Sequence, residues 1–381
     1  MTQPGPLAFY VPSLTVGGAE RVTVSVANGL AERGYDVHLL VSYYEGSFVS
    51  EVDEAVTVFD LATPKVPGLG IGASVPRLVS YFRRQSPSML FAQMIYASDV
   101  VLVAHMLAGS DALVVPTVHN TVGMYDPPKE RLVQRLATLL SGRADRFVAV
   151  SDGAARSVAD ELAVPAENVS VLHNPIPVDD VRARACEAAN HEWIEADEYD
   201  VVLGIGRLAP QKDFETFLRA FAHVNEADPD TRAIVVGRGP DRERLAATAR
   251  ELGIDDLVQF TGYVDNPYSY MAGADVLAMS SIHEGLPTVL IEALACGCPV
   301  VSTDCPSGPR TILEDGKYGP LVDVEDPTAL GEAVLSTLES PPDSSMLVER
   351  ARDFAPEEVL DDYESFITTH GPFPAVTEPT A

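Results

Sequence analysis

The amino-acid sequence predicts an α/β protein made of two Rossmann-like, doubly wound domains that face a central cleft. Three observations lead to this prediction. Short apolar runs alternate with amphipathic stretches, as in a parallel sheet covered by helices on both faces. The alternation stops near residue 174 and resumes near residue 200. A length of 381 residues also fits two domains better than one.

The first half of the chain contains five apolar runs that are expected to form strands. The pair Gly17-Gly18 follows the first run and precedes an expected helix over about residues 19–33, which Gly34 ends. Helical stretches separate the later runs. The expected strands cover residues 7–11, 36–42, 89–93, 112–118 and 146–150.

The segment Asn174-Pro175-Ile176-Pro177 marks the expected domain boundary, because prolines at alternate positions suit neither a helix nor a central strand. We expect an N-terminal domain over residues 1–175 and a C-terminal domain over residues 176–350. Residues 351–381 are expected to form a helix that packs back on the N-terminal domain, followed by a flexible tail.

The second half repeats the alternation of strands and helices. Strands are expected over residues 201–205, 233–236, 258–260, 276–279 and 300–302. Helices are expected over residues 214–224, 241–252 and 288–295. In sheets of this kind, ligands bind outside the carboxyl ends of the strands.

The charge of the chain is strongly negative, with 56 acidic and 26 basic residues and a formal net charge of -30. Such a surface repels nucleic acid. It suits a protein kept soluble at high salt, so we expect a salt-adapted, halophilic source; an ordinary acidic enzyme is the alternative. No secretory signal and no apolar run of membrane-spanning length is evident. The expected location is the cytoplasm, at the inner face of the cell membrane.

The first motif that indicates chemistry is the loop over residues 204–212, with the sequence G-I-G-R-L-A-P-Q-K, between a strand and a helix. Its glycines allow a tight turn, and the N-terminus of the following helix offers free N–H groups to an anion. Arg207 and Lys212 add two cations, so a diphosphate fits this loop. A plain turn with solvated charges is the alternative. Ala209 stands at the third glycine position, so a full dinucleotide fingerprint is missing.

The second motif covers residues 281–299 and carries two glutamates, Glu284 before the expected helix and Glu292 inside it. Eight residues are close to two helical turns, so both carboxylates could line one pocket. Carboxylates accept hydrogen bonds from paired hydroxyls, such as those of a sugar or a ribose. Glu292 taken alone would be an ordinary surface charge.

Taken together, the motifs resemble retaining glycosyltransferases of family 4. The resemblance rests on E-G-L-P-T-x-L-I-E-A-x-A-x-G-x-P-V-V from Glu284, on G-R-x-x-x-x-K from Gly206, and on G-G-A-E-R from Gly17. It covers roughly residues 7–325 and implies a GT-B fold, with the donor held mainly by the second domain. It also implies a nucleotide diphosphate sugar as the donor, with UDP and GDP the favoured nucleotides, and no further cofactor.

The resemblance assigns roles to residues of both halves. Arg207 and Lys212 would neutralise the leaving diphosphate, and Glu292 would bind the ribose. His119 matches a histidine that the family places beside the transferred sugar, although a histidine after a strand is more often a packing residue. The residues expected to act in catalysis are Glu284, Arg207, Lys212 and His119. Those expected to bind the donor are Gly17, Gly18, Gly206, Arg207, Lys212, Gly237, Gly285, Leu286, Pro287, Thr288 and Glu292.

The implied reaction moves a hexose-type sugar with retention of configuration, and the leaving diphosphate helps to deprotonate the incoming hydroxyl on the same face. Cations and helix dipoles at the leaving group then supply the main electrostatic stabilisation, and no metal site is expected. The one Asp-x-Asp match, Asp228-Pro229-Asp230, is interpreted as a solvated turn. Asp213 follows Lys212 where the family commonly has glycine.

The acceptor side is less defined by the sequence. Residues 74–88 and 127–146 are locally basic within an acidic chain, and both belong to the half that the resemblance assigns to the acceptor. A basic surface edged by apolar residues suits an anionic membrane or a lipid phosphate. Solvated helix faces are the alternative. We expect a polyprenyl-phosphate-linked glycan as acceptor, as in surface polysaccharide assembly or protein glycosylation, and peripheral membrane contact.

Other functions remain open at this point. A non-transferring GT-B relative, such as a nucleotide-sugar epimerase, would carry the same donor motifs. An NAD-dependent Rossmann enzyme would explain the loop at Gly204 but not the pair Glu284 and Glu292. A two-lobed binding protein is disfavoured because no signal peptide is evident.

Overall fold

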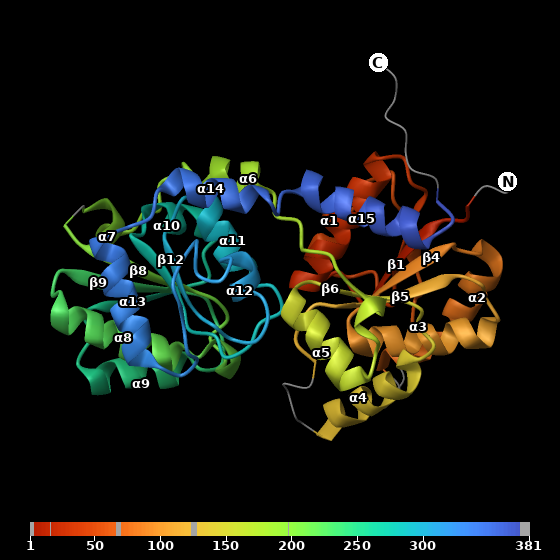
Figure 1. Ribbon diagram of the computed structural model, residues 1–381, viewed down its shortest axis with the longest axis horizontal. Helices are drawn as coiled ribbons and strands as arrows, with labels where there is room; N and C mark the ends of the chain where they lie inside the picture. The colour runs from red at the N-terminus through yellow and green to blue at the C-terminus, as the bar shows by residue number, and fades with distance from the viewer. Residues whose placement is uncertain (1–3, 16, 66–69, 123–127, 197, 374–381) are drawn as a thin grey trace, which may run out of the picture. The chain divides into compact units, whose positions relative to one another are not determined.

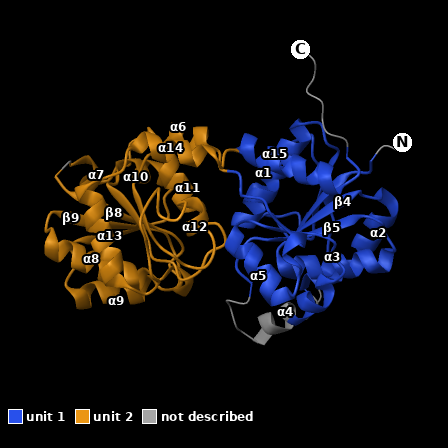
Figure 2. Cartoon of the chain, viewed as in Figure 1, with its two compact units in different colours: residues 1–175, 356–381 blue, residues 176–355 orange. Residues whose placement is uncertain are grey.

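The computed structural model describes residues 4–15, 17–65, 70–122, 128–196 and 198–373, without the side chains of residues 128–134. Contacts divide the chain into two compact units (Figure 2). Unit 1 comprises Met1–Pro175 together with Pro356–Ala381, and unit 2 comprises Ile176–Ala355. The last segment of the chain therefore belongs to the first unit.

Unit 1 is built on a parallel sheet, and helices on both faces bury its apolar central strands. Its described residues form seven strands in the order β3-β2-β1-β4-β5-β6-β7. The chain moves outward from β1 to β3 and then returns to β4, so the strand order reverses between β1 and β4. The strands are β1 (Leu7–Val11), β2 (Val37–Val41), β3 (Thr57–Asp60), β4 (Met89–Gln93), β5 (Leu113–Val118), β6 (Phe147–Ala149) and β7 (Val169–Val171).

Helices cover both faces of the unit 1 sheet (Figure 1). One core joins the sheet to α1 and α15, and another joins it to α2 and α3. Arg33 at the end of α1 bonds Asp361 and Glu364 of α15 at 2.6 and 2.5 Å. The helices are α1 (Gly18–Glu32), α2 (Val75–Gln85), α3 (Ile95–Ala108), α4 (Pro128–Ser141), α5 (Asp152–Leu162) and α15 (Pro356–His370), with short 3₁₀ turns η1 (Ser47–Glu51), η2 (Gly70–Ser74) and η3 (Ala166–Asn168).

Unit 2 repeats the same plan with six parallel strands among its described residues, in the order β10-β9-β8-β11-β12-β13. Here the order reverses between β8 and β11. The strands are β8 (Asp200–Ile205), β9 (Thr231–Val236), β10 (Val258–Gly262), β11 (Val276–Met279), β12 (Val300–Thr303) and β13 (Leu321–Val322). The helices are α6 (Val178–Ala185), α7 (Glu192–Glu195), η4 (Pro210–Lys212), α8 (Phe214–Ala227), α9 (Arg242–Leu252), α10 (Pro267–Gly273), α11 (Thr288–Ala295), α12 (Pro309–Ile312), α13 (Pro327–Glu339) and α14 (Ser344–Arg352).

The two sheets confirm the predicted fold class, an α/β protein with two Rossmann-like, doubly wound sheets. The positions where the strand order reverses are where such sheets bind ligands. In unit 2, the loops that follow β8 and β11 lie at that position, and they carry the two motifs singled out in the sequence. Within the described ranges, none of the helices has the length and apolar character needed to cross a bilayer.

Candidate active site

The loop after β8 is fixed by backbone bonds to the loop after β9. The N–H of Gly206 donates to the carbonyl of Val236 at 3.0 Å, and the N–H of Leu208 donates to that of Arg238 at 3.0 Å. Gly237 has a φ of +143°, and a Cβ there would overlap the carbonyl oxygen of Gly206. Glycine is therefore required at position 237 by the close approach of two backbones.

A buried carboxylate lies between the two motif loops. Glu284 is only 7% exposed, and its Oε1 accepts a hydrogen bond from Ser281 Oγ at 2.7 Å. The same oxygen lies 2.5 Å from Lys212 Nζ. Two residues that were predicted to act at the donor are thus in direct contact. Burial deprives this carboxylate of hydration, and the Lys212 ammonium and the Ser281 hydroxyl compensate for that loss.

Three further bonds hold the two loops in register. Gln211 Nε2 donates to the carbonyl of His283 at 2.9 Å, and the N–H of Ile282 donates to the carbonyl of Gln211 at 2.9 Å. Ser280 Oγ donates to the carbonyl of Lys212 at 2.9 Å. The position of Lys212 relative to Glu284 is therefore set by the backbone and not only by the ion pair itself.

Arg207 differs from Lys212 in having an exposed side chain. Among the residues that the structure describes, its guanidinium takes part in no ion pair. The loop after β8 thus presents one compensated cation and one uncompensated cation. Because the chain carries a net charge of -30, an uncompensated arginine at the carboxyl edge of the sheet is available to an anionic ligand.

The second motif ends in the N-terminus of α11. Ser307 Oγ and the N–H of Gly308 both donate to the carbonyl of Gly285, at 2.8 and 3.0 Å. These bonds fix the turn that leads through Leu286 and Pro287, both of them buried, into Thr288 at the first turn of the helix. Amides in a first helical turn lack an intrahelical acceptor, which makes this end of α11 suitable for an anion.

Glu292 lies one turn into α11 and is half-buried. Tyr268 of α10 donates a hydrogen bond from its hydroxyl to Glu292 Oε1 at 3.4 Å. The Tyr268 side chain is buried, and the Arg184 guanidinium lies 5.0 Å from the centre of its ring. The orientation of Glu292 is therefore supported from a neighbouring helix.

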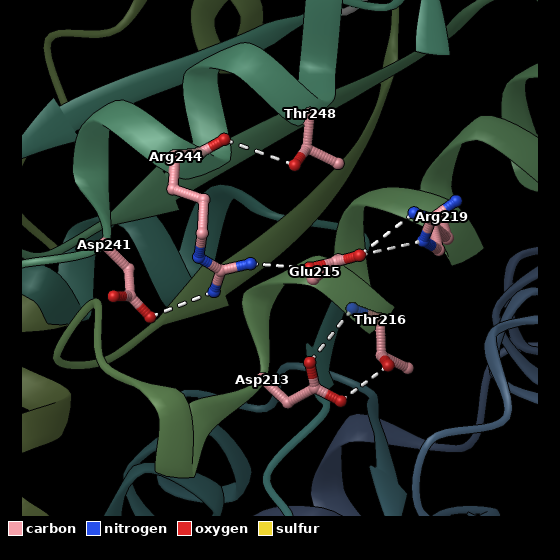
Figure 3. Close-up of polar contacts among 7 residues, drawn as sticks. All are labelled: Asp213, Glu215, Thr216, Arg219, Asp241, Arg244 and Thr248. Atoms are coloured by element: carbon pink, nitrogen blue, oxygen red, sulfur yellow. Dashed lines mark hydrogen bonds and ion pairs between the residues drawn. The ribbon is translucent and has the colours of Figure 1, made fainter. Parts of the chain in front are cut away.

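A polar network braces the helices that begin behind the two glycine loops (Figure 3). Asp213 adopts the left-handed conformation at φ +43° and caps α8 by accepting hydrogen bonds from the N–H and Oγ1 of Thr216, at 3.3 and 2.6 Å. Arg244 of α9 links Glu215 of α8 to Asp241, at 2.5 and 3.0 Å. Asp213 thus forms the left-handed turn before α8, and its carboxylate supplies a cap that a glycine there would lack.

Three predicted site residues belong to unit 1. Gly17 and Gly18 lie at the N-terminus of α1, and a Cβ at Gly18 would meet no other atom within 4 Å. His119 follows β5, and its Nε2–H donates to Gln93 Oε1 at 2.5 Å. Burial lowers the pKa of His119 to about 4, so the imidazole is neutral. Within the described part of the chain, its Nδ1 is buried and has no hydrogen-bond partner.

The basic stretches of unit 1 are only partly described. In α2, Arg77, Arg83 and Arg84 are exposed. The apolar residues Leu78, Tyr81 and Phe82 instead face the core. In residues 127–146, the side chains of Lys129 and Arg131 lie outside the described residues.

The remaining candidate for metal binding forms a turn. Asp228 Oδ1 accepts a hydrogen bond from the N–H of Asp230 at 3.2 Å, in the connection between α8 and β9. Within the described ranges, no three His, Cys, Asp or Glu side chains are grouped as metal ligands.

Several residues of the site were not singled out from the sequence. Ser281 contacts Glu284 within its own motif, whereas Gln211 contacts His283 of the other motif. Their polar side chains beside Glu284 and Lys212 were the available signal. Tyr268 lies 24 positions from Glu292 and carried no signal, because helix packing alone brings the two together.

Comparison with solved structures identifies the fold. The Anabaena protein HepE, crystallised in complex with UDP, superposes with a TM-score of 0.79 and 21% sequence identity, covering 96% of this chain and 100% of the other. The protein thus has the GT-B fold of glycosyltransferases.

Family comparisons agree with this result. The model of Glycosyltransferase Family 4 matches residues 16–180, and that of Glycosyl transferases group 1 matches residues 187–354. The chain therefore belongs to the group 1 glycosyltransferases that carry a family 4 domain at the N-terminal side.

Two curated relatives indicate the range of the family. The N-acetylgalactosamine-N,N'-diacetylbacillosaminyl-diphospho-undecaprenol 4-alpha-N-acetylgalactosaminyltransferase of Campylobacter jejuni is 27% identical over 87% of this chain and 90% of its own length. The GDP-mannose-dependent alpha-(1-6)-phosphatidylinositol monomannoside mannosyltransferase of Mycolicibacterium smegmatis is 36% identical over 43% of this chain and 44% of its own length. Both names describe acceptors that carry a lipid.

Proposed function

We propose that this glycosyltransferase moves a hexose-type sugar, with retention of configuration, from a UDP-sugar to a hydroxyl of a polyprenyl-diphosphate-linked glycan. The observation that carries the donor part is the pairing of the two loops of unit 2. Exposed Arg207, the Lys212–Glu284 pair and the N-terminus of α11 lie at the reversal point of one sheet.

The chemistry follows from these charges. Arg207 and Lys212 neutralise the diphosphate as it leaves, which lowers the barrier through an electrostatic effect that acts mainly in the transition state. Glu284 contacts the sugar, and Glu292 accepts hydrogen bonds from the ribose hydroxyls. Gly18 leaves room for the diphosphate, and neutral His119 contacts the transferred sugar without adding a charge beside the developing oxocarbenium-like centre.

The choice of UDP is supported by the fold neighbour from Anabaena, which was crystallised with UDP. The mannosyltransferase relative is named as GDP-mannose-dependent, so GDP-sugars are the competing donors. The acceptor proposal is supported by the relative from Campylobacter, whose name specifies a diphospho-undecaprenol acceptor. Such an acceptor would place the protein at the inner face of the cell membrane, in the assembly of surface polysaccharide or glycoprotein glycans.

A direct experiment separates these donors. Thermal unfolding is measured with UDP, GDP, ADP or NAD added separately. A nucleotide that binds should stabilise the folded protein by roughly 2.7 kcal/mol when it is present at about 100 times its dissociation constant. We expect a shift with UDP that is lost in Arg207→Ala. Arg250→Ala, at an exposed arginine of α9, is the control that should keep it. A higher melting temperature with NAD alone would contradict the proposal. A higher melting temperature with GDP alone would mean that the donor is a GDP-sugar and not a UDP-sugar.

A second measurement tests the transfer. The donor that shifts the melting temperature is incubated with a membrane extract containing lipid-linked glycans, and the anomeric configuration of the new linkage is determined by NMR. An α-linkage from an α-linked donor supports retention. Hydrolysis or epimerisation of the donor without an acceptor would point to a non-transferring relative.

The acidic composition supports one further proposal, that the protein works at high salt. Unfolding measured over a range of KCl concentrations should show greater stability at high salt, because screening relieves the repulsion among 56 acidic side chains. A melting temperature that falls with added KCl would contradict salt adaptation.

A further inference from the structure

The sheet of unit 1 has its own reversal point, between β1 and β4. The chain leaves β1 for α1, which packs on one face of the sheet, and it leaves β4 for α3, which packs on the other face. The first turns of these two helices therefore diverge from neighbouring strands, and this divergence leaves room for a ligand in a parallel sheet. Three titratable side chains of the two helices are not used in the proposed donor chemistry. They are Glu20 of α1 and Tyr96 and Asp99 of α3.

Tyr96 is the second residue of α3 and has an exposed aromatic ring. The residue is 43% exposed. Partial burial and the negative charge of Glu20 raise the pKa of Tyr96. The carboxylate of α1 and the phenol of α3 therefore act on each other across the reversal point. An exposed tyrosine ring offers a ligand a flat apolar surface with a polar edge.

Glu20 is held close to the start of α1. It is the third residue of the helix, and a Cβ at Gly17 would overlap its Oε2, so the carboxylate folds back over the helix N-terminus. Glutamate often takes this course from the third helical position. Burial raises the pKa of Glu20. The carboxylate thus stays at the carboxyl edge of the sheet instead of extending into solvent.

Asp99 follows Tyr96 by three positions, so the two residues share one side of α3. Asp99 is half-buried, and burial raises the pKa of its carboxyl to about 7. Among the residues that the structure describes, this carboxyl has neither a hydrogen bond nor an ion pair. A half-buried polar group without a partner costs free energy, and a hydroxyl of a ligand would supply the missing bond.

The turn into α3 fixes the position of Tyr96. Met94 has a φ of +73°, a positive value that is uncommon for residues other than glycine. Its N–H donates to the carbonyl of Thr117 at 3.0 Å. Its own carbonyl accepts from the N–H of Ser98 at 2.9 Å and from the Oγ of Ser98 at 3.0 Å. A backbone conformation of this kind persists only where the surrounding bonds hold it, so the start of α3 is rigid.

We infer that Tyr96, Glu20 and Asp99 bind a pyranose ring of the acceptor glycan, with the ring stacked on Tyr96 and its hydroxyls donating to the two acidic groups. The inference rests on the proposed function and deepens it, because it names the part of the acceptor that unit 1 recognises. A sugar ring combines a C–H face that packs on an aromatic ring with hydroxyls that donate to carboxylates.

The same three groups disfavour the other parts of a lipid-linked acceptor. The negative charge of Glu20 repels a diphosphate. A prenyl chain would pack on Tyr96 but would leave the carboxyls of Glu20 and Asp99 without donors. The charges therefore favour a sugar ring at this edge of unit 1.

Saturation-transfer NMR with the full-length protein, without donor, tests the inference. The probes are the methyl α-glycosides of glucose, galactose, N-acetylglucosamine and N-acetylgalactosamine, each added separately. We expect saturation transfer to at least one of them. Tyr96→Ala removes the ring and should weaken binding of that glycoside about tenfold, whereas Tyr96→Phe keeps the ring and should change it less than about twofold. Asp99→Asn should weaken it about fivefold.

Tyr44→Ala is the matched control. Tyr44 is 44% exposed and follows β2 at the same edge of the sheet, so this variant removes an equally exposed tyrosine from outside the proposed subsite. It should bind the glycoside like the natural protein. Tyr44→Ala and Tyr96→Ala should both melt like the natural protein, because both rings are exposed.

Three results would overturn the inference. The first is undiminished glycoside binding by Tyr96→Ala, and the second is an equal loss of binding in Tyr44→Ala. The third is the absence of saturation transfer to all four glycosides in the natural protein. Geranyl phosphate is the probe for the lipid part of the acceptor. Binding of geranyl phosphate that Tyr96→Ala abolishes would also overturn the inference, because the ring would then contact the lipid.

The inference and the proposed function fail in different ways. With a lipid-linked glycan as acceptor, Tyr96→Ala should raise the KM for the acceptor about tenfold and change the KM for the UDP-sugar less than about twofold. Transfer with an unchanged acceptor KM would refute the sugar subsite alone. Glycoside binding that depends on Tyr96, without transfer from any UDP- or GDP-sugar, would refute the proposed function alone.

Discussion

Lys212 Nζ lies 2.5 Å from Glu284 Oε1, although the two residues are 72 positions apart in the chain. The pair joins the loop that follows β8 to the loop that follows β11. A diphosphate arriving at Lys212 would compete with Glu284 for the same ammonium group. The pair is therefore a structural link between the loops and, under the proposed function, a contact that would rearrange when the donor binds.

The Lys212–Glu284 pair should show strong coupling in a double-mutant cycle. Lys212→Met leaves the Glu284 carboxylate buried and without a cation, which should cost roughly 2 to 3 kcal/mol of unfolding free energy. Adding Glu284→Gln should restore most of this stability but not activity, which should fall about a hundredfold or more in either variant. Urea unfolding can be followed by Trp193, the single tryptophan, which lies in unit 2. Additive losses in the double variant would show that the pair is not coupled.

Arg207→Ala should affect binding and not stability. The side chain is exposed, so its removal should change the unfolding free energy by less than about 0.5 kcal/mol. The affinity for UDP, measured by calorimetry, should fall at least tenfold, because hydrogen bonds between charged groups contribute about 1.5 to 3 kcal/mol. An unchanged affinity would place the diphosphate elsewhere.

Gly237→Ala should be among the most damaging substitutions in unit 2. It combines a φ of +143° with an overlap between the new Cβ and the carbonyl oxygen of Gly206, so we expect a loss of more than about 2 kcal/mol. Gly253→Ala is the matched control, because Gly253 also has a positive φ, +70°, but open space around it. Its cost should stay near 1 kcal/mol. Equal losses in the two variants, measured by urea unfolding, would mean that the overlap is relieved by a backbone shift.

Three substitutions of Asp213 should separate its conformation from its cap. Asp213→Asn keeps both the tolerance for left-handed backbone and the acceptor for Thr216, so it should be nearly neutral. Asp213→Gly keeps the backbone freedom and loses the cap, and Asp213→Ala loses both. The expected order of melting temperatures is Asn, then Gly, then Ala. A glycine variant more stable than the natural protein would show that the cap contributes nothing.

His119 should make unit 1 less stable as the pH falls. Its pKa in the folded state, about 4, lies below the ordinary value of 6.5, so the unfolded chain takes up the proton first. Stability should therefore decline from pH 6.5 downward by up to about 1.4 kcal/mol per pH unit, and His119→Gln should lack this part of the decline. This loss of stability is measured by hydrogen exchange of the backbone amides of β4 and β5 at pH 7 and pH 5. An equal loss of stability with falling pH in the natural protein and in His119→Gln would mean that His119 does not cause the pH dependence.

Much of the fold was predictable because its central strands are continuous apolar runs between clear turn signals. The runs at 7–11, 89–93 and 276–279 match β1, β4 and β11 residue for residue. The strands β3, β7 and β13 were not predicted. Their sequences, T-V-F-D, V-S-V and L-V, are short and partly exposed at or near sheet edges, so burial imposes no recognisable pattern on them.

The site was predictable where one stretch of sequence forms it. The positions of Arg207, Glu284 and Thr288 at the ends of strands and the start of a helix follow from the local pattern. The contact between Lys212 and Glu284, and the support of Glu292 by Tyr268, depend on the packing of segments far apart in the chain. A single sequence contains no local signal for such pairs.

The contact between Gly206 and Gly237 has an evolutionary consequence. Because the loop after β8 occupies the space that side chains at Gly237 and Gly239 would need, the two segments cannot diverge independently. An insertion in one would require a compensating change in the other within the same lineage. Diversification of this enzyme toward new donors should therefore proceed through side chains around the paired loops, while the length of the loops stays fixed.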